Sequence, residues 1–202
     1  MKRMLTMVVS AAAALLSTAA LAAAMVGQPA PDFSAVDTNG KTHRLADYKG
    51  KYVVLEWVNP GCPFVRKHYS GNMQATQKEI VGKGAVWLAV NSTAESQSDY
   101  LPPAKMEAWM KEKNALVTAT LMDADGKIGK AYGAKTTPHM YIIDPQGTLV
   151  YAGAIDSIPS ARVEDIDKAT NYVKQAFGEL MAGKPVSVAT TTAYGCTVKY
   201  AN

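Results

Sequence analysis

Apolar residues in this chain are grouped into short runs, separated by polar segments that contain proline and glycine. Five of these runs have the length expected of strands: residues 52–58, 85–90, 118–122, 140–143 and 148–151. The first two are apolar almost throughout, as parallel strands covered on both faces are. The last two flank the turn sequence DPQG at 144–147, which predicts an antiparallel hairpin.

Helical patterns lie between the predicted strands. A long helix is expected from Cys62 onward, because Pro63 fits the first turn, where its missing N–H costs nothing. A second helix opens at Pro102, and a short one ends at Gly133. The last is predicted over residues 163–181, with one apolar face formed by Val163, Ile166, Ala169, Val173, Phe177 and Leu180. This order predicts an α/β fold, a mixed sheet flanked by helices in the thioredoxin arrangement.

The first residues have the features of an export signal. Lys2 and Arg3 give a positive start, residues 8–16 are apolar, and small-x-small cleavage sites end at Ala22 and Ala24. The apolar stretch is shorter than the roughly 20 residues that a membrane span needs. We therefore expect a signal peptide at 1–24 and one domain at 25–202, in the periplasm or secreted; the alternative is an uncleaved membrane anchor.

Charge and motif content exclude several classes of function. The formal net charge is +4, and it falls to +2 once the leader, with its two basic residues and no acid, is removed. So weak a positive charge gives no case for binding nucleic acid or an anionic membrane surface. The sequence also lacks a glycine-rich phosphate loop, a paired-histidine metal motif and a serine-nucleophile elbow. We expect neither a cofactor nor a metal.

Cys62 is the residue that most clearly points to chemistry. It follows a buried strand and stands where a helix should begin, and the unpaired N–H groups and dipole of a helix start favour a thiolate. Arg66, one helical turn further on, would add positive potential. The alternative is an inert, buried thiol.

Glu56 interrupts the apolar strand six residues before Cys62. A carboxyl group buried beside the sulfur would have a raised pKa and could carry a proton during disulfide exchange. Alternatively, Glu56 faces solvent or pairs with a lysine. Of the histidines, His139 either reaches the site as a proton carrier or points to the other face of its strand. We expect His68 on a helix surface and His43 in a loop.

Four segments of the chain form recognisable motifs: 28–33 (QPAPDF), 48–54 (YKGKYVV), 59–65 (NPGCPFV) and 136–144 (TTPHMYIID). Together they resemble the redoxin group, which contains the alkyl hydroperoxide reductase/thiol-specific antioxidant proteins and their peroxiredoxin-like and thioredoxin-like relatives. The ending 193–200 (AYGCTVKY) is similar to the tail of a peroxiredoxin-like subgroup. The resemblance implies a thioredoxin-like fold, a redox-active Cys62, and a cis-proline loop at Thr137-Pro138 that lies against the cysteine and accepts an extended substrate backbone.

The sequence also departs from the patterns of these families. Val65 occupies the place of the second cysteine of a thioredoxin, and Leu55 and Asn59 stand where a peroxiredoxin has proline and threonine or serine. Cys196, in the extended segment after Gly183, is the only other cysteine. A sulfenate on Cys62 would condense with it, and an external thiol would reopen the disulfide. The alternative is a permanent structural bridge.

Three functions fit these observations. The first is a thiol-dependent peroxidase in which Cys62 attacks a hydroperoxide and Cys196 resolves the product. The second is a thiol-disulfide oxidoreductase that acts on protein disulfides, with the 137–138 loop binding the partner chain. Both need a reducing thiol partner, and the family analogy suggests a membrane thiol-electron transporter. The third is a copper-binding chaperone that uses Cys62 with a histidine.

Overall fold

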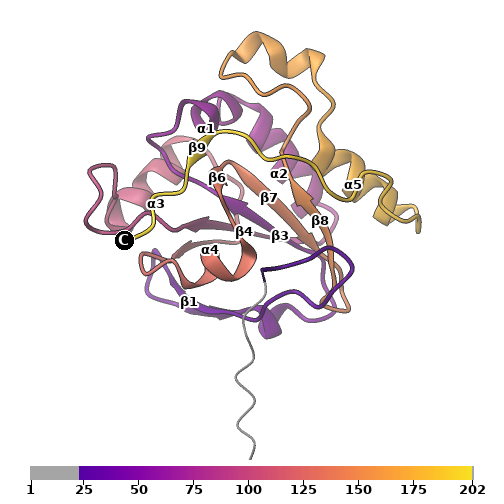
Figure 1. The fold of residues 1–202 in the computed structure, drawn as a ribbon, viewed down its shortest axis with the longest axis horizontal. Helices are drawn as coiled ribbons and strands as arrows, with labels where there is room; N and C mark the ends of the chain where they lie inside the picture. Colours follow the sequence, from indigo (N-terminus) through magenta and orange to yellow (C-terminus); the bar gives the residue numbers. More distant parts are fainter. Residues whose placement is uncertain (1–22, 202) are drawn as a thin grey trace, which may run out of the picture.

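The computed structural model describes residues 23–201, which form a sheet covered on both faces by helices (Figure 1). The seven strands of the main sheet lie in the order β2-β1-β5-β4-β3-β7-β8. Their bounds are β1 Ser34–Asp37, β2 Thr42–Arg44, β3 Val53–Trp57, β4 Val86–Asn91, β5 Ala119–Met122, β7 His139–Ile143 and β8 Leu149–Gly153. The short strands β6 Thr136–Thr137 and β9 Cys196–Thr197 form a second, two-stranded sheet.

The main sheet is mixed, as predicted. Strands β3, β4 and β5 run parallel at its centre, while β7 and β8 on one side and β1 and β2 on the other are antiparallel to their neighbours. Residues of β3 are buried throughout, which explains why this strand is apolar in almost every position. In the register of β3 with β7, Glu56 is opposite Met140 and Trp57 is opposite His139.

Each face of the sheet has its own apolar core. The first core receives residues from α1 Pro63–His68, α2 Asn72–Val81, α3 Pro103–Glu112 and α5 Tyr172–Met181. The second is covered by α4 Lys127–Tyr132 and by the segment that leads into β1. The 3-10 helix η1, Leu45–Tyr48, follows β2. Cys62 belongs to the first core and Trp57 to the second, so the two residues lie on opposite faces.

The C-terminal segment, residues 184–201, crosses the molecule in an extended conformation (Figure 1, yellow). It first pairs with the edge strand β8, where Ala152 N donates to Ala189 O at 3.1 Å. It then reaches the β6 loop, where β9 pairs with β6 and Val198 N donates to Lys135 O at 3.0 Å. The segment thus closes the edge of the main sheet and ends next to the loop that contains Pro138.

Two helix predictions are wrong in their extent. The long helix expected from Cys62 ends at His68 and resumes as α2 at Asn72, because Gly71 has a φ of 136° and interrupts it. The helix expected over 163–181 is two elements, the 3-10 helix η2 Val163–Lys168 and α5. Asn171 begins α5 by accepting a hydrogen bond from Lys174 N. The predicted apolar face therefore combined residues of two separate elements, because Val163 lies before the start of α5.

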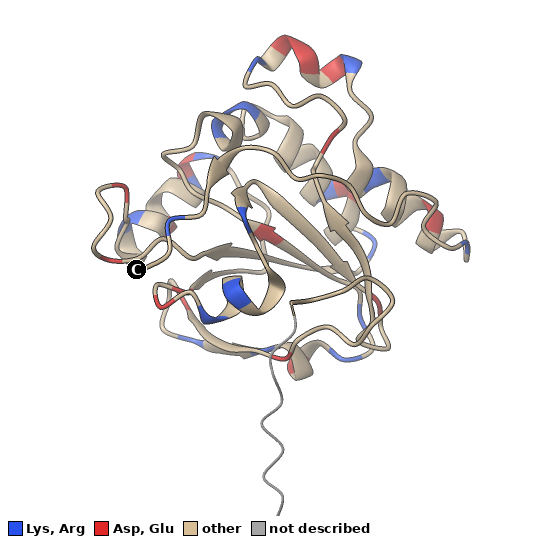
Figure 2. Cartoon of the chain, in the orientation of Figure 1, with Lys and Arg blue, Asp and Glu red and all other residues tan. Residues whose placement is uncertain are grey.

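The segment around η2 projects from the body of the molecule and carries both acidic and basic side chains (Figure 2). None of the helices within 23–201 is long and apolar enough to cross a bilayer. The predicted signal peptide falls almost entirely on residues outside the described range and stays a prediction, as does the boundary at residue 25.

Candidate active site

Cys62 lies at the start of α1, as predicted. It is the N-cap residue, with extended backbone angles, and Pro63 occupies the first helical turn. Its side chain is only 2% exposed, and no hydrogen bond caps the helix through the sulfur. Instead, Sγ donates to the carbonyl oxygen of Thr137 at 3.1 Å. The buried thiol is therefore oriented by the neighbouring loop rather than by the helix N–H groups.

That loop contains the cis peptide bond that the resemblance implied, between Thr137 and Pro138. Thr137 is buried and belongs to β6, so one side of its backbone pairs with β9 while its carbonyl meets Cys62. The loop before Cys62 is fixed as well, because Asn59 Oδ1 accepts from Gly61 N at 2.7 Å. Asn59 also donates to Thr93 Oγ1 and Asp99 Oδ2, at 3.1 and 2.8 Å.

Cys196 is brought to the same place from the far end of the chain. In β9 it lies directly opposite Thr137, the residue whose carbonyl accepts from Cys62 Sγ, and its half-buried side chain packs against the core that contains Cys62. Both cysteines are free thiols in this structure. Burial, and to a smaller extent the proximity of Cys62, raises the pKa of Cys196 to about 12. Cys196 is thus a protonated thiol held beside Cys62 at neutral pH.

Gly195 makes this approach possible, and the sequence patterns did not single it out. Its φ is 134°, and a Cβ atom on it would lie 2.0 Å from the Thr137 carbonyl oxygen. That oxygen is the acceptor of the Cys62 thiol. The C-terminal segment therefore packs against the cis-proline loop so closely that only glycine fits.

Glu56 is fully buried, which excludes the solvent-facing alternative. Its Oε2 atom accepts hydrogen bonds from Trp87 Nε1 at 2.8 Å and Gln77 Nε2 at 3.2 Å, while Oε1 has no partner. Burial raises the pKa of Glu56 to about 7. The raised pKa agrees with expectation, but the hydrogen bonds of this carboxyl go to β4 and α2 and not to a cysteine.

The histidines differ from expectation. His139 pairs with Trp57 on the face of the sheet away from Cys62, and burial lowers its pKa to about 4. It therefore does not join Cys62 as a proton carrier or a metal ligand. The surface position expected for His68 is wrong, since its side chain is fully buried. His43 lies in β2 and is buried against Asp37 and Tyr48, not in a loop.

Sequence patterns missed a buried polar cluster that joins α1 to the C-terminal segment. Lys67 and His68 of α1 meet Asp156, which follows β8, and Tyr194, two residues before Cys196. Consecutive polar residues in a helix that packs on the core were the available signal at positions 67 and 68. Nothing local marked Asp156 or Tyr194.

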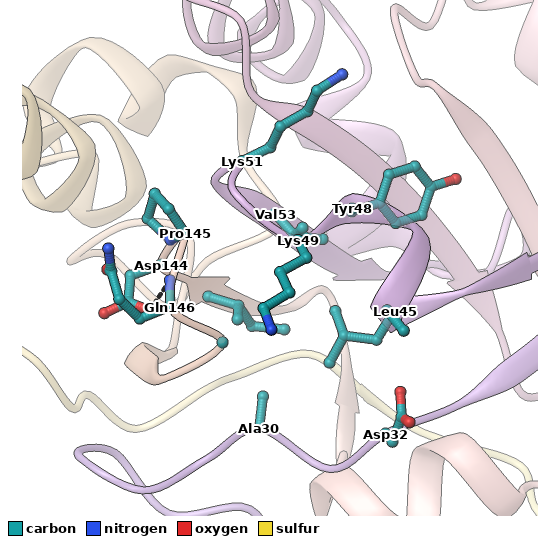
Figure 3. A pocket seen from close by; sticks show the side chains of 13 residues that line it. Ala30, Asp32, Leu45, Tyr48, Lys49, Lys51, Val53, Asp144, Pro145 and Gln146 are labelled. Carbon is teal, nitrogen blue, oxygen red and sulfur yellow. Dashed lines mark hydrogen bonds between the residues drawn. The ribbon is translucent and has the colours of Figure 1, made fainter.

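A cavity of about 290 Å³ lies at the other end of β3 (Figure 3). Its lining includes Tyr48, Lys49 and Lys51 near the start of β3, and Asp144 and Gln146 of the hairpin turn. It contains neither cysteine nor histidine and is separated from Cys62 by the length of the strand. Among residues 23–201, no group of three or more His, Cys, Asp or Glu side chains is placed to hold a metal.

A strand, a cysteine that starts a helix, and a cis-proline loop against that cysteine define a thioredoxin-fold protein of the thiol-dependent class. Within that class the chain belongs to the AhpC/TSA family, whose sequence profile matches residues 26–152. The match includes Cys62 and Pro138 and ends before Cys196.

Named relatives share much of the chain. The thioredoxin-like protein YneN of Bacillus subtilis (strain 168) is 31% identical over 143 residues, which cover 70% of this chain and 79% of the relative. The thiol-disulfide oxidoreductase ResA of the same organism is 31% identical over 61% of this chain and 64% of its own. The thiol:disulfide interchange protein DsbE of Escherichia coli (strain K12) is 28% identical over 77% and 80%.

Two solved structures share the fold over more of the chain than residues 26–152. A hypothetical protein from Sinorhizobium meliloti 1021 superposes with a TM-score of 0.78 at 24% identity, covering 89% of this chain and 97% of that protein. An uncharacterized conserved protein from Geobacillus kaustophilus gives 0.73 at 27% identity, with 88% and 93% covered. The shared fold therefore includes more of the chain than the family match does.

Proposed function

We propose that this protein is a thiol-disulfide oxidoreductase whose redox couple is Cys62 and Cys196. The observation that carries the proposal is that both cysteines meet the cis-proline loop at the same residue: Cys62 Sγ donates to the Thr137 carbonyl, and Cys196 lies opposite Thr137 in the β6–β9 pair. The similarity to ResA, a thiol-disulfide oxidoreductase, and to DsbE, a thiol:disulfide interchange protein, supports it. The couple would replace the paired cysteines of a thioredoxin, because Val65 stands at the position of the second cysteine.

The exchange proceeds in two displacements. The Cys62 thiolate attacks one sulfur of a partner disulfide, which forms a mixed disulfide and releases a partner thiolate. Cys196 then loses its proton and attacks the Cys62 sulfur, which closes the Cys62–Cys196 bond and releases the second partner thiolate. Two electrons and two protons pass to the partner. The Thr137 carbonyl orients the Cys62 thiol, Pro138 fixes that carbonyl, and Glu56 serves as a buried proton reservoir on the same face of the sheet.

Reduction of a disulfide-containing polypeptide tests this function. The reduced protein is mixed with oxidised insulin, free thiols on insulin are counted, and peptide mapping determines which protein sulfurs become joined. We expect a Cys62–Cys196 bond in the wild type, no insulin reduction by Cys62→Ser, and an accumulated mixed disulfide on Cys62 in Cys196→Ser. Equal insulin reduction by all three proteins would exclude the couple.

A peroxidase is the second candidate, favoured by the AhpC/TSA match and by a second thiol placed to resolve an oxidised Cys62. The Cys62 thiolate would attack a hydroperoxide to give a sulfenate and an alcohol or water. Condensation with the Cys196 thiol would then give the disulfide and one water molecule. Stopped-flow consumption of hydrogen peroxide by wild type and Cys62→Ser tests it, and equal rates would exclude it.

We propose export as the setting of this chemistry, on the basis of the leader-like residues 1–24. An oxidising compartment supplies disulfides but no reducing thiol pool, so regeneration of the dithiol requires a dedicated reductant. A membrane thiol-electron transporter is the kind of partner that fits. Fractionation of cells that express the full chain, with sequencing of the mature N-terminus, tests the location.

A further inference from the structure

A cluster of four polar side chains, three of them buried and the fourth half-buried, lies where the C-terminal segment passes α1. Lys67 Nζ lies 3.3 Å from Asp156 Oδ2, and His68 Nε2 lies 3.8 Å from the same oxygen. The side chains of Lys67 and His68 are fully buried, and that of Asp156 is 2% exposed. The hydroxyl of Tyr194 is the fourth member, and it is the only one contributed by the C-terminal segment.

The Tyr194 hydroxyl links the other groups. It donates to Asp156 Oδ1 and accepts from His68 Nε2 at 3.1 Å. His68 Nδ1 accepts from Asn72 Nδ2 at 2.8 Å, so the imidazole is neutral with its proton on Nε2. Burial lowers the pKa of His68 to about 4, in agreement with a neutral ring. The Tyr194 ring packs edge-on against Phe64 of α1, with centroids 5.7 Å apart.

Such a cluster is costly to bury, and the exchange reaction proposed above does not use it. Two charged groups removed from water are tolerated only where each is paired and hydrogen-bonded. Here Lys67 also reaches Ile158 O at 3.4 Å, and Asp156 Oδ1 also accepts from Ile158 N at 3.1 Å. The pairing holds Asp156 in place as the acceptor for Tyr194.

The position of Tyr194 limits the position of Cys196. Only Gly195 separates them, and an extended chain advances at most about 3.6 Å per residue, so Cys196 must lie within roughly 7 Å of the anchored residue. Cys62 is in the loop that starts α1, and Lys67 and His68 are in α1 itself. The cluster therefore connects the helix that begins at one sulfur with the segment that carries the other.

We propose that Asp156 and Tyr194 are positioning residues for the Cys62–Cys196 couple. The buried Asp156 carboxylate, held by Lys67, binds the Tyr194 hydroxyl and keeps the C-terminal segment docked with Cys196 against Cys62. This role rests on the proposed function, since it matters for chemistry only if the two cysteines form a redox pair.

Tyr194→Phe is the variant that tests this role, because it removes the hydroxyl and keeps the ring against Phe64. Asp156→Asn is less suitable, since it leaves Lys67 buried without a counter-charge. Tyr200→Phe is the matched control: Tyr200 lies on the other side of Cys196, and its hydroxyl donates to the neutral Ala134 carbonyl at 2.7 Å. Each protein is equilibrated with mixtures of reduced and oxidised glutathione, in which closure of Cys62–Cys196 converts one oxidised glutathione to two reduced molecules.

We expect Tyr194→Phe to lower the equilibrium constant for closure roughly tenfold, the ratio that one hydrogen bond to a charged group supports. More of Cys62 should then remain as a mixed disulfide with glutathione. Tyr200→Phe should change the constant by less than about threefold. An unchanged constant in Tyr194→Phe would overturn the proposal.

Melting temperatures of both tyrosine variants in a Cys62→Ala/Cys196→Ala background separate positioning from general stability. A bond that stabilised the reduced and oxidised forms equally would lower the melting temperature and leave the glutathione equilibrium unchanged, which would also overturn the proposal. Failure of the proposed function looks different. In that case the wild type itself forms no Cys62–Cys196 bond at any glutathione ratio.

Discussion

The two cysteines are held by different kinds of structure. Cys62 is positioned by its immediate neighbours, namely the strand before it, the Asn59 turn and the helix start at Pro63. Cys196 is positioned by residues far away in the sequence: Thr137, Asp156 and Ala94, whose N–H donates to Lys199 O at 2.9 Å. The position of the Cys62 sulfur is therefore set by a local motif, whereas the position of the Cys196 sulfur depends on the completed fold.

This difference shows which side of the proposed redox couple is easier to disturb. A change near Cys62 must disturb a buried strand and two packed cores before it moves the sulfur. A change in the C-terminal segment needs only to release a surface strand of two residues and its flanking contacts. Such segments open at a lower free energy than the core does. The following predictions test that contrast.

Gly195→Ala should have the largest effect, because it should prevent the segment that carries Cys196 from docking. A Cβ atom 2.0 Å from the Thr137 oxygen must displace the segment, and we expect docking to weaken by about 3 kcal/mol, roughly a hundredfold. The measurement is the rate at which the Cys62–Cys196 bond forms, determined by counting free thiols during oxidation. Gly147→Ala is the control, because Gly147 has a φ of 88° but a Cβ atom on it would meet no other atom within 4 Å. If both variants close the bond at the wild-type rate, the close approach at Gly195 is unimportant.

Glu56 should make the stability of the strand that leads to Cys62 fall as the pH rises from 4.5 to 7. Its pKa rises from 4.5 in the unfolded chain to about 7 on folding, so the folded protein keeps a proton that the unfolded chain loses. This contribution to stability is complete below pH 4.5 and is lost as the pH rises through 7, about 3 kcal/mol in all. His68 and His139, with pKa values lowered to about 4, act in the opposite direction below pH 6.5.

The contribution of Glu56 is therefore measured as the difference in unfolding free energy between the wild type and a variant that cannot titrate at this position. Urea unfolding of wild type and Glu56→Gln at several pH values should give two curves whose separation changes between pH 4.5 and 7, in favour of the wild type at the acid end. Two parallel curves would show that Glu56 does not titrate in this range.

Lys199→Gln should have the smallest effect. The Lys199–Asp99 ion pair, with atoms 3.0 Å apart, is 43% and 24% exposed, and such pairs contribute at most about 1 kcal/mol. We expect alkylation of Cys196, measured in a Cys62→Ser background, to accelerate by no more than about fivefold at low salt. In about 1 M salt the alkylation rates of the variant and the wild type should become equal, because salt screens the ion pair. A large effect that salt does not reduce would mean that Lys199 holds the segment by other contacts.

The contrast also explains what could be predicted from the sequence. Strands β3, β4, β5, β7 and β8, the helix start at Cys62 and the cis bond at Pro138 follow from local patterns or from the resemblance, and the structure agrees with each. The interruption at Gly71 and the helix start at Asn171 were missed because apolar spacing continues across both. The peroxidase hypothesis and the signal peptide stay predictions.

The rest of the site depends on contacts that no local pattern records. Tyr194 meets Asp156, and Gly195 meets Thr137, only because the last segment returns across the sheet. His68 looked like a surface residue because a histidine among polar residues usually is one, and its burial becomes intelligible only beside Tyr194. The raised pKa of Glu56 was expected, whereas its partners Trp87 and Gln77 depend on the packing of β4 and α2.

The late position of Cys196 in the chain has a consequence for biosynthesis. Ribosomes make the N-terminal part first, so Cys62 and the strands around it exist before the residues that carry Cys196 have been joined to the chain. With two cysteines in the whole sequence, no incorrect internal pairing is available during that interval. A nascent or truncated product that stops before Cys196 has the proposed nucleophile without its partner, so the proposed couple can form only after translation has passed Cys196.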